Sequence, residues 1–349
     1  MEGEMKMPTK EDLRYFQSMP LEIKVGMTRT RIREWVNYYG ESGTYVSFSG
    51  GKDSTVLLHL VRELYPDISA MFVNTGLEFP EIQSFVKSFK NIMIVRPEMR
   101  FDQVIKQYGY PMITKDISHK IYDARMGRKW SVKYLKGQAK KSDGSPSQFN
   151  IPKYHPLTEV DFCISHKCCD VMKKGPAHKY EKQTSRVAIT AVMASESRMR
   201  EAQWIRSGCN AFDNKKPISN PMSFWTENDV LQYIKQNDIQ IASVYGQVIN
   251  CDNLYQLSML ESQDECKYRT TGCDRTGCIF CGFGAHLHND QRFVRLKQTH
   301  PKQYNYCING GEYDIDGFWK PNQKGLGLGH VIDKLNELYS KNGKAFIEY

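Results

Sequence analysis

One glycine-rich segment constrains the fold of this chain more than any other feature: it reads Ser47-Phe48-Ser49-Gly50-Gly51-Lys52-Asp53-Ser54-Thr55. Residues 44–46 before it are β-branched or aromatic and predict a buried strand, and residues 56–64 after it are apolar at helical spacing. Glycines let the backbone approach a ligand closely, and the free N–H groups and dipole at a helix start favour negative charge. We therefore expect a phosphate-binding loop formed by Ser47, Ser49, Gly50, Gly51, Lys52, Asp53, Ser54 and Thr55.

The pattern around this loop predicts an α/β fold with a parallel twisted sheet and helices on both faces. Short apolar runs at 68–73, 92–95 and 187–190 alternate with helical patterns, as in chains that form parallel sheets. Residues before Gly40 carry an apolar stripe at helical spacing, and this glycine is placed to end the helix.

These patterns divide the 349 residues into three expected parts. Residues 1–40 form a helical lead-in, 41–230 form the nucleotide-binding domain with a basic insertion at 115–153, and 231–349 form a C-terminal region around a cysteine knuckle. No run of eighteen apolar residues occurs, so we expect no membrane helix, and the charged start of the chain predicts a cytoplasmic protein.

The six residues Ser-Gly-Gly-Lys-Asp-Ser, 49–54, resemble the PP-loop of the N-type ATP pyrophosphatases. The resemblance implies the adenine nucleotide alpha hydrolase-like fold and a loop that holds the pyrophosphate of ATP while the α-phosphorus is attacked. It also implies catalytic roles for Lys52 and Asp53. Lys52 would stabilise the charge that develops on pyrophosphate, and Asp53 would hold Mg²⁺ or brace the loop.

A second segment, Asn74-Thr75-Gly76-Leu77-Glu78-Phe79-Pro80-Glu81, follows the next predicted strand. It resembles the Asp-Thr-Gly-x-Glu-Phe-Pro-Glu stretch of the phosphoadenosine phosphosulfate reductase branch of this superfamily, with an amide in place of the usual acid. The resemblance implies nucleotide contacts from Asn74, Thr75, Gly76 and Glu78, because open α/β sheets bind ligands at this edge. A plain turn between strand and helix stays open as an alternative.

Two later segments resemble substrate-binding parts of the same branch. Residues 194–200 are similar to its Glu-Ser-x-x-Arg element, and Cys168-Cys169 with the lysines that follow are similar to its Cys-Cys-x-x-x-Lys element. Guanidinium groups offer planar forks to phosphate or sulfate, although ordinary surface arginines are the alternative. The residues expected to bind substrate are Glu196, Ser197, Arg198, Arg200, Lys173 and Lys174.

The cysteines predict a metal centre. Cys273, Cys278 and Cys281 lie at C-x4-C-x2-C spacing among glycines, and three thiolates need a fourth ligand to close a zinc site or hold a [4Fe–4S] cluster. Cys168 or Cys169 is the first candidate and Cys209 the next. Ligand chemistry permits iron or zinc, and the resemblance favours an iron–sulfur cluster.

Residues 115–153 carry ten lysines and arginines against three aspartates, and the whole chain has a net charge of +9. Basic side chains interleaved with aromatic ones suit a nucleic acid, whose phosphates and bases they can contact. A solvated loop over the nucleotide site is an equal alternative. The residues expected to bind nucleic acid are Arg128, Lys129, Trp130, Lys133, Tyr134 and Lys136.

Three functions follow from these features. The first is an ATP pyrophosphatase that adenylylates an acceptor oxygen for sulfur transfer, similar to the sulfurtransferases of DNA phosphorothioation and tRNA thiolation, with ATP, Mg²⁺, an iron–sulfur cluster, DNA or RNA and a cysteine desulfurase as ligands and partners. The second is a reductase that forms sulfite from phosphoadenosine or adenosine phosphosulfate. Such reductases use a cysteine in a C-terminal Glu-Cys-Gly-Leu-His segment, which this chain lacks. The third is a regulator that binds ATP and nucleic acid without turnover. The sequence leaves assembly into a homo-oligomer open.

Overall fold

The computed structural model describes residues 8–212, 216–251, 267–287 and 290–349. These residues fall into two compact units that interleave along the chain. The first unit comprises Met1–Asn74, Glu78–Val95 and Ala177–Thr276, and the second comprises Thr75–Leu77, Arg96–Pro176 and Gly277–Tyr349. The predicted three-part division into contiguous stretches stays a prediction. In the described parts of the chain, no helix combines the length and apolar character needed to cross a membrane.

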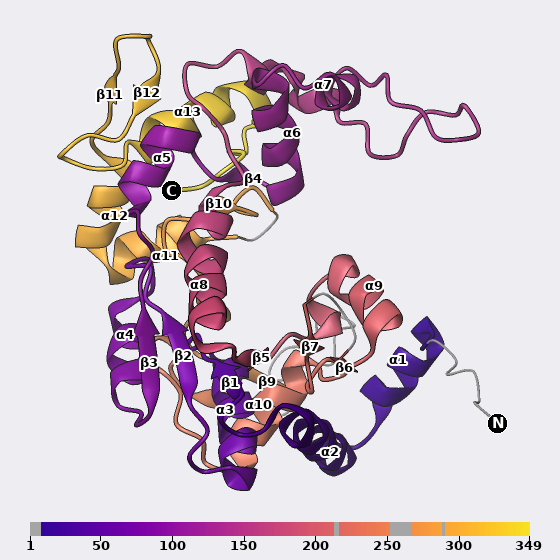
Figure 1. The fold of residues 1–349 in the computed structure, drawn as a ribbon. Helices are drawn as coiled ribbons and strands as arrows, with labels where there is room; N and C mark the ends of the chain where they lie inside the picture. Colours follow the sequence, from indigo (N-terminus) through magenta and orange to yellow (C-terminus); the bar gives the residue numbers. More distant parts are fainter. Residues whose placement is uncertain (1–7, 213–215, 252–266, 288–289) are drawn as a thin grey trace. The chain divides into compact units, whose positions relative to one another are not determined.

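The first unit is built on a four-stranded parallel sheet with the order β3-β2-β1-β5 (Figure 1). Its strands are β1 (Thr44–Ser47), β2 (Ala70–Val73), β3 (Ile92–Val95) and β5 (Val187–Ile189). All four match predicted strands, and the parallel α/β fold class is confirmed. Strand order runs outward from β1 to β3 and then restarts on the other side of β1. Ligands of open α/β sheets bind beyond the carboxyl end of the strands at such a switch point.

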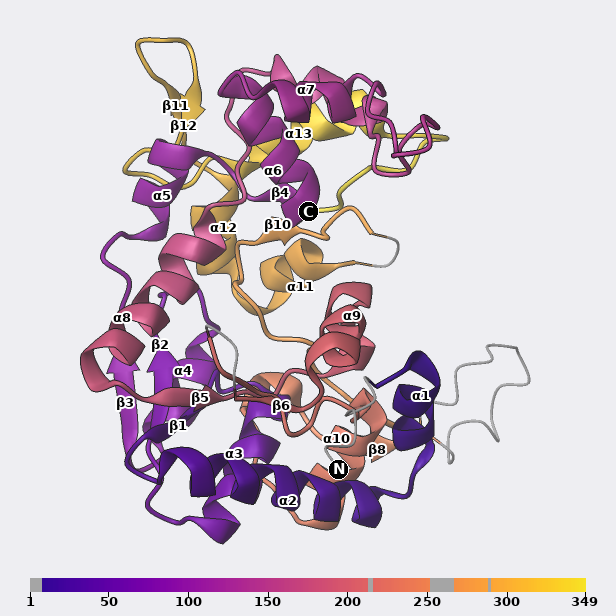
Figure 2. The same ribbon diagram turned by 45° about the vertical axis from the view of Figure 1, so that its right-hand side comes forward.

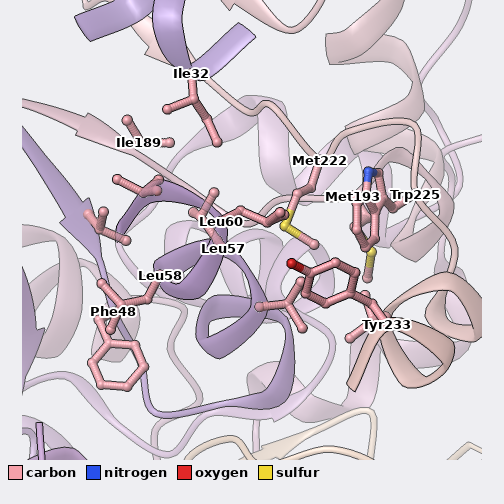
Figure 3. Packing of buried hydrophobic residues seen from close by; sticks show 14 of the residues in the cluster. Ile32, Phe48, Leu57, Leu58, Leu60, Ile189, Met193, Met222, Trp225 and Tyr233 are labelled. Carbon is pink, nitrogen blue, oxygen red and sulfur yellow. The ribbon is translucent and has the colours of Figure 1, made fainter. Parts of the chain in front are cut away.

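Side chains of β1 and β2 alternate between the two faces of the sheet and are buried on both, whereas Met93 and Ile94 of β3 are exposed. Val46 and Phe72 point into the large core shared with α2, α3 and α10, whereas Tyr45 and Met71 pack with Tyr180 of α8 on the opposite face. Figure 3 shows this large core, in which leucines of α3 meet Ile32 of α2 and Tyr233 of α10. The helices of this unit are α1 (Lys10–Ser18), α2 (Leu21–Tyr39), α3 (Lys52–Leu64), α4 (Pro80–Lys87), α8 (Gly175–Thr184), α9 (Arg198–Ser207) and α10 (Glu227–Gln236).

The first two helices, α1 and α2, pack on this core. Helix α2 lies next to α3 (Figure 2) and ends at Gly40, whose φ of +76° suits glycine. A buried ion pair joins α2 to α10: Lys24 Nζ lies 2.7 Å from Asp229 Oδ2 and also donates to the Gln17 carbonyl. Asp229 in turn accepts the backbone N–H of Thr226, the N-cap of α10.

The second unit is mainly helical. Its strand β4 (Met112–Ile113) pairs in parallel with β10 (Gly282–Phe283), and β11 (Glu312–Tyr313) forms a hairpin with β12 (Trp319–Lys320). Its helices are α5 (Phe101–Tyr108), α6 (Lys115–Arg125), α7 (Lys129–Leu135), α11 (Arg292–Thr299), α12 (Pro301–Ile308) and α13 (Leu328–Tyr339). Short elements complete both units: η1 (Pro152–Thr158), η2 (Asp170–Lys174), η3 (Ala194–Glu196), η4 (Ser243–Tyr245), β6 (Asn210–Ala211), β7 (Ile218–Ser219), β8 (Val248–Asn250) and β9 (Tyr268–Thr270).

Candidate functional site

The two glycines of the loop, Gly50 and Gly51, have different structural roles. Gly50 has a φ of +72°, and a Cβ there would lie 2.8 Å from Cγ2 of both Ile82 and Val86 on α4. Gly51 is the N-cap of α3 with an ordinary φ of −76°, and a Cβ there would stand 3.3 Å from the Tyr245 hydroxyl. Gly50 therefore lets the loop turn tightly against α4, and Gly51 keeps the positive end of α3 accessible to an anion.

The loop hydroxyls brace this turn. Ser54 Oγ and Thr55 Oγ1 both donate to the Gly51 carbonyl, at 2.9 and 3.0 Å. Ser49 Oγ lies 3.0 Å from Ser54 Oγ and accepts the N–H of Gly51. The hydroxyls of these predicted nucleotide-binding residues thus fix the loop's shape, while Ser47 ends β1 beside it.

Lys52 is the buried cation of the site, with only 4% of its side chain exposed. Its Nζ donates to the Asp274 carbonyl at 2.8 Å and lies 3.0 Å from Glu227 Oε1. Burial opposes its charge, but the carboxylates of Asp53 and Glu227 outweigh burial and raise the pKa of Lys52. A permanent positive charge therefore sits at the start of α3.

Asp53 supplies a carboxylate with spare bonding capacity. Its Oδ1 is buried and has no hydrogen-bond partner among the described residues, although Lys52 Nζ lies 3.9 Å away. Burial raises the pKa of Asp53; the charges of Lys52, Arg275 and Arg200 oppose this shift, and Glu227 adds to it. A buried carboxylate oxygen without a donor fits a hard cation such as Mg²⁺, which prefers oxygen ligands.

Arginines from two segments gather around Glu196. Arg275 Nη2 lies 2.9 Å from Glu196 Oε1, and Arg200 pairs with the other carboxylate oxygen. Ser197 caps α9 by accepting the N–H of Arg200. Arg200 and Arg275 both act on the charge of Asp53, so this group borders the loop, whereas Arg198 is exposed at the first position of α9. The structure thus brings Glu196, Ser197 and Arg200 to the loop.

Sequence reasoning missed several residues of this site. The Tyr245 hydroxyl accepts the backbone N–H of Lys52 at 3.2 Å and lies 2.5 Å from Thr276 Oγ1. Three further residues contact predicted site residues: Glu227 and Asp274 contact Lys52, and Arg275 contacts Glu196. Glu227 follows Trp225 and Thr226 in a segment that carries no predicted site residue, and residues 274–276 lie among the knuckle cysteines. Only the folded structure shows that these residues lie next to the loop. No local signal marks Tyr245.

The Asn74 segment leaves the carboxyl end of β2, the strand beside β1. The Asn74 N–H donates to the Val95 carbonyl at 2.8 Å, which holds this turn to the neighbouring strand. Gly76 has a φ of +74°, and Thr75 Oγ1 accepts the N–H of Leu77. Residues 75–77 belong to the second unit and Glu78 to the first. Nucleotide contacts from these residues stay a prediction.

In the second unit, adjacent thiols share one side of a distorted helix. The Sγ atoms of Cys168 and Cys169 are 3.9 Å apart, which a regular helix does not allow for neighbouring residues. The distortion is the π-helical turn η2, which follows directly and whose Lys173 and Lys174 are exposed. The hydrogen bond that Cys168 donates to Cys169 raises the pKa of Cys168 and lowers the pKa of Cys169. Burial opposes the lowering of the Cys169 pKa, and the charges of Lys115 and Lys173 add to it.

Two knuckle cysteines belong to the same thiol group. Cys278 and Cys281 both act on the charge of Cys168, and burial with Cys278 raises the pKa of Cys281 to about 11. Within the described ranges, no three His, Cys, Asp or Glu side chains are grouped around a single ion position. Cys273 lies in the first unit, and its ligation stays a prediction. Cys209 also lies there, where its sulfur accepts the Ser223 hydroxyl.

The ten basic residues of 115–153 separate into two groups. Lys115 pairs with Asp170, Lys120 with Asp116, Arg125 donates to the carbonyls of 158, 160 and 162, and Lys153 lies over three aromatic rings. The others are exposed: Arg128, Lys129, Lys133, Lys136, Lys140 and Lys141. Trp130 and Tyr134 share a face of α7, with ring centroids 6.0 Å apart. Lys153 is exposed as well, so the second group differs from the first in its place, on or next to α7, and not in exposure alone.

The fold and the loop define an α/β protein whose glycine-rich loop lies at a sheet switch point. The sequence profile of the phosphoadenosine phosphosulfate reductase domain family matches residues 43–126 and 139–282, well over half of the chain. The chain belongs to this family. A membership of this breadth confirms the predicted resemblance.

The similarity to individual proteins is distant. The chain is 24% identical over 287 residues to an uncharacterized protein of Methanocaldococcus jannaschii, covering 78% of this chain and 50% of that protein. It is 24% identical to adenosine 5'-phosphosulfate reductase of Staphylococcus haemolyticus, covering 71% and 84%. It is 26% identical to sulfate adenylyltransferase subunit 2 of Shewanella loihica, covering 57% and 58%. The chain thus spans half the length of the archaeal relative.

Among solved structures, a phosphoadenylyl-sulfate reductase from Candida auris in complex with phosphate matches 69% of this chain and 92% of its own, with a TM-score of 0.36 and 12% identity. The family and its relatives include reductases and adenylyltransferases. Membership therefore defines a family of nucleotide-using enzymes and leaves the particular reaction unassigned.

Proposed function

We propose that this protein binds ATP at the loop 49–54 and transfers AMP to an acceptor oxygen. The acceptor oxygen attacks the α-phosphorus, the bond from that phosphorus to the bridging oxygen breaks, and pyrophosphate leaves. The observation that supports this proposal is the intact Ser-Gly-Gly-Lys-Asp-Ser loop at the start of α3, with the buried Lys52 cation beside it. Backbone N–H groups, the helix dipole and Lys52 would stabilise charge that develops on pyrophosphate.

The proposed roles of the other groups follow from their charges. Asp53 would hold Mg²⁺, which screens the phosphate charges when bound, because its Oδ1 is buried without a donor. Arg200 and Arg275 would contact the α-phosphate or the acceptor, since both surround Asp53 and carry planar donor forks. Glu196 would orient these guanidinium groups. Arg198 would reach substrate from an exposed position, whereas substrate contacts from Lys173 and Lys174 of the second unit stay a prediction.

We also propose that a sulfur nucleophile then displaces AMP from the acceptor. A persulfide carried by a donor such as a cysteine desulfurase would deliver that sulfur. Attack by the terminal sulfur of the persulfide expels AMP, which takes the former acceptor oxygen and the electron pair of its bond, and leaves an acceptor–S–S–donor disulfide. A second thiol, supplied by the donor or by a small thiol reductant, would then cleave the S–S bond, so that the thiolated acceptor is released and the two thiols leave as a disulfide. Adenylylation makes chemical sense for this exchange, since a bare phosphate or carbonyl oxygen is a poor leaving group.

An iron–sulfur cluster would bind four of the six cysteine thiols of the second unit, those of Cys168, Cys169, Cys278 and Cys281. Thiolates around one zinc ion lie about 3.8 Å apart, from the Zn–S distance in a tetrahedral site. Thiolates of a [4Fe–4S] cluster each bind a different iron and therefore lie farther apart. The Sγ atoms of Cys168 and Cys169 are 3.9 Å apart, which is the spacing of a zinc site, so the preference for iron over zinc rests on the family resemblance and not on this distance. The cluster would supply redox or sulfur-carrying capacity, and Cys273 would not be needed.

The test of the nucleotide site is Lys52→Ala. Removal of one preorganised donor to a developing charge costs roughly 10²–10³-fold in rate. We expect a rate loss of this size in pyrophosphate release from ATP, measured with an enzyme-coupled phosphate assay. The circular dichroism spectrum of the variant should match that of the wild type. The control variant is Lys87→Ala, which removes an exposed lysine of α4. Lys24 is as buried as Lys52, but it is unsuitable as a control because its ion pair with Asp229 stabilises the fold. Equal turnover of Lys52→Ala and wild type would refute the proposed role.

The test of the cluster compares two knuckle cysteines. Protein purified without oxygen should contain about four irons and absorb near roughly 400 nm. Cys281→Ser should lose most of the iron, because it removes one of the four grouped thiols, whereas Cys273→Ser should keep it. Iron loss in both variants would return Cys273 to the ligand set. Stoichiometric zinc without iron in the wild type would refute the cluster.

The reductase that forms sulfite is the second candidate, supported by the similarity to adenosine 5'-phosphosulfate reductase. Cys307 is the described cysteine nearest the C-terminus, and burial raises its pKa, so it is a poor nucleophile. Sulfite formation with thioredoxin and no pyrophosphate release would favour this candidate. ATP binding with neither product would favour the third candidate, a regulator without turnover.

A further inference from the structure

The exposed basic residues and aromatic rings of α7 form one continuous feature. Lys129 and Lys133, at i and i+4, lie along one stripe of the helix about 6 Å apart, and Lys136 follows directly as the C-cap of α7. Trp130 and Tyr134 form the adjacent stripe. We call these residues, together with Arg128, Lys140 and Lys141, the α7 surface.

The α7 surface is held in place by neutral contacts that leave its charges unused. The hydroxyl of Ser131 donates to the Lys120 carbonyl on α6, and the Ile151 N–H donates to the Tyr134 carbonyl. Asn150 binds the backbone of both Gly137 and Ala139 and thereby secures the loop that carries Lys140 and Lys141. The six cations of the surface are therefore presented on ordered backbone, facing solvent.

The aromatic stripe offers a ring to a planar ligand. Trp130 packs edge-to-face against His119 and Tyr134, at 5.4 and 6.0 Å between centroids, and yet 41% of it is exposed. Tyr134 also receives the ammonium of Lys120 over its ring, at 5.3 Å. Trp130 is thus fixed in orientation on its packed side and open on its other side.

The family match separates the α7 surface from the part of the chain that the family shares. The two matched segments end at 126 and resume at 139, so α7 lies outside them. Four of the six cations and both aromatic residues of the surface fall in that interval. The family's shared nucleotide chemistry therefore gives no reason for them.

We propose that the α7 surface binds a single strand of nucleic acid, with phosphates along the lysine stripe and a base stacked on Trp130. Six exposed cations exceed what one triphosphate can neutralise, whereas a polyanion engages them together and releases counterions. Stacking on an aromatic ring is available to an unpaired base and not to one inside a duplex. That the bound strand is also the acceptor of AMP rests on the proposed function.

The experiment measures binding of fluorescein-labelled dT20 and U20 by fluorescence anisotropy at several salt concentrations. The test variant replaces Arg128, Lys129, Lys133 and Lys136 by alanine. The matched control removes the same charge from exposed lysines elsewhere, Lys87, Lys90, Lys182 and Lys235. The test variant should flatten the slope of log K against log salt by about 0.7 for each lost phosphate contact, and the control should not. Trp130→Ala should weaken binding roughly 5- to 150-fold.

The outcomes are separable. Equal loss in the test and control variants, no binding by the wild type, or tighter binding of a 20-base-pair duplex with no effect of Trp130→Ala would overturn the proposal. Pyrophosphate release without nucleic acid should be the same in the test variant and wild type. Binding that depends on the α7 surface, in a protein that releases no pyrophosphate, would support the surface and refute the proposed function alone.

Discussion

The adjacent glycines of the loop offer a test that separates folding from ligand binding. In Gly50→Ala the new methyl would meet two Cγ2 atoms at 2.8 Å, and its backbone would keep a φ of +72°. A left-handed conformation costs an alanine about 1–2 kcal/mol and overpacking a core about 1–3 kcal/mol. The two effects together predict a loss of about 2–5 kcal/mol in the free energy of unfolding.

Gly51→Ala should give the opposite result. The residue has an ordinary φ, and its Cβ would stand 3.2 Å from a movable serine hydroxyl, so we expect a loss of about 1 kcal/mol, typical of alanine at an N-cap. The methyl would, however, stand where an anion approaches α3. Loss of a hydrogen bond to a charged group weakens ATP binding about 10- to 150-fold.

The assays are urea denaturation for stability and titration calorimetry with ATP for binding. A Gly50→Ala protein as stable as wild type would refute the steric argument. Unchanged ATP affinity in Gly51→Ala would refute the assignment of the anion site to the start of α3.

Two further predictions use charges around the loop. Burial raises the pKa of Asp53, and its ionised form is needed to hold Mg²⁺, so the acid limb of pyrophosphate release should lie above the pH typical of a free aspartate. Glu227→Gln removes a negative charge that raises the pKa of Asp53 and should move the acid limb to lower pH. Arg275→Gln removes a positive charge that lowers this pKa and should move the acid limb to higher pH. Shifts of the limb in the same direction in both variants would contradict the assignment of the limb to Asp53. Lys24→Met should lower the free energy of unfolding by about 3–5 kcal/mol in urea, because it leaves the buried Asp229 carboxylate without its cation. Adding Asp229→Asn should recover much of that loss, and a double variant no more stable than the single one would argue against the ion pair.

The sequence predicts well what depends on neighbouring residues. The strand 92–95 matches the structure, and α2 ends at Gly40, the glycine expected to end it. The glycine-rich loop also lies between a strand and a helix as expected. Each of these features is encoded within a few residues, where periodicity and capping chemistry act.

Features that depend on distant residues were not predictable in the same way. Lys52 meets Glu227 and the Asp274 carbonyl, 175 and 222 residues along the chain, and neither contact leaves a local pattern. The basic segment shows the same limit: its composition is visible in the sequence, but which cations are already paired within the molecule depends on α6 and residues 158–170. Tertiary packing decides which charges remain available.

The ion pair between Lys24 and Asp229 also bears on how this protein can be divided. Glu227, which holds Lys52, occupies the first turn of the helix whose capping carboxylate Lys24 neutralises. A fragment that starts at residue 41 would keep every loop residue and yet place that carboxylate in an apolar core with no counter-charge. In such a fragment the start of α10 would be less stable, and the ion pair between Glu227 and Lys52 would weaken. Helix α2 therefore supplies, through Lys24, the counter-charge of the helix that also positions Glu227 beside Lys52 of the loop.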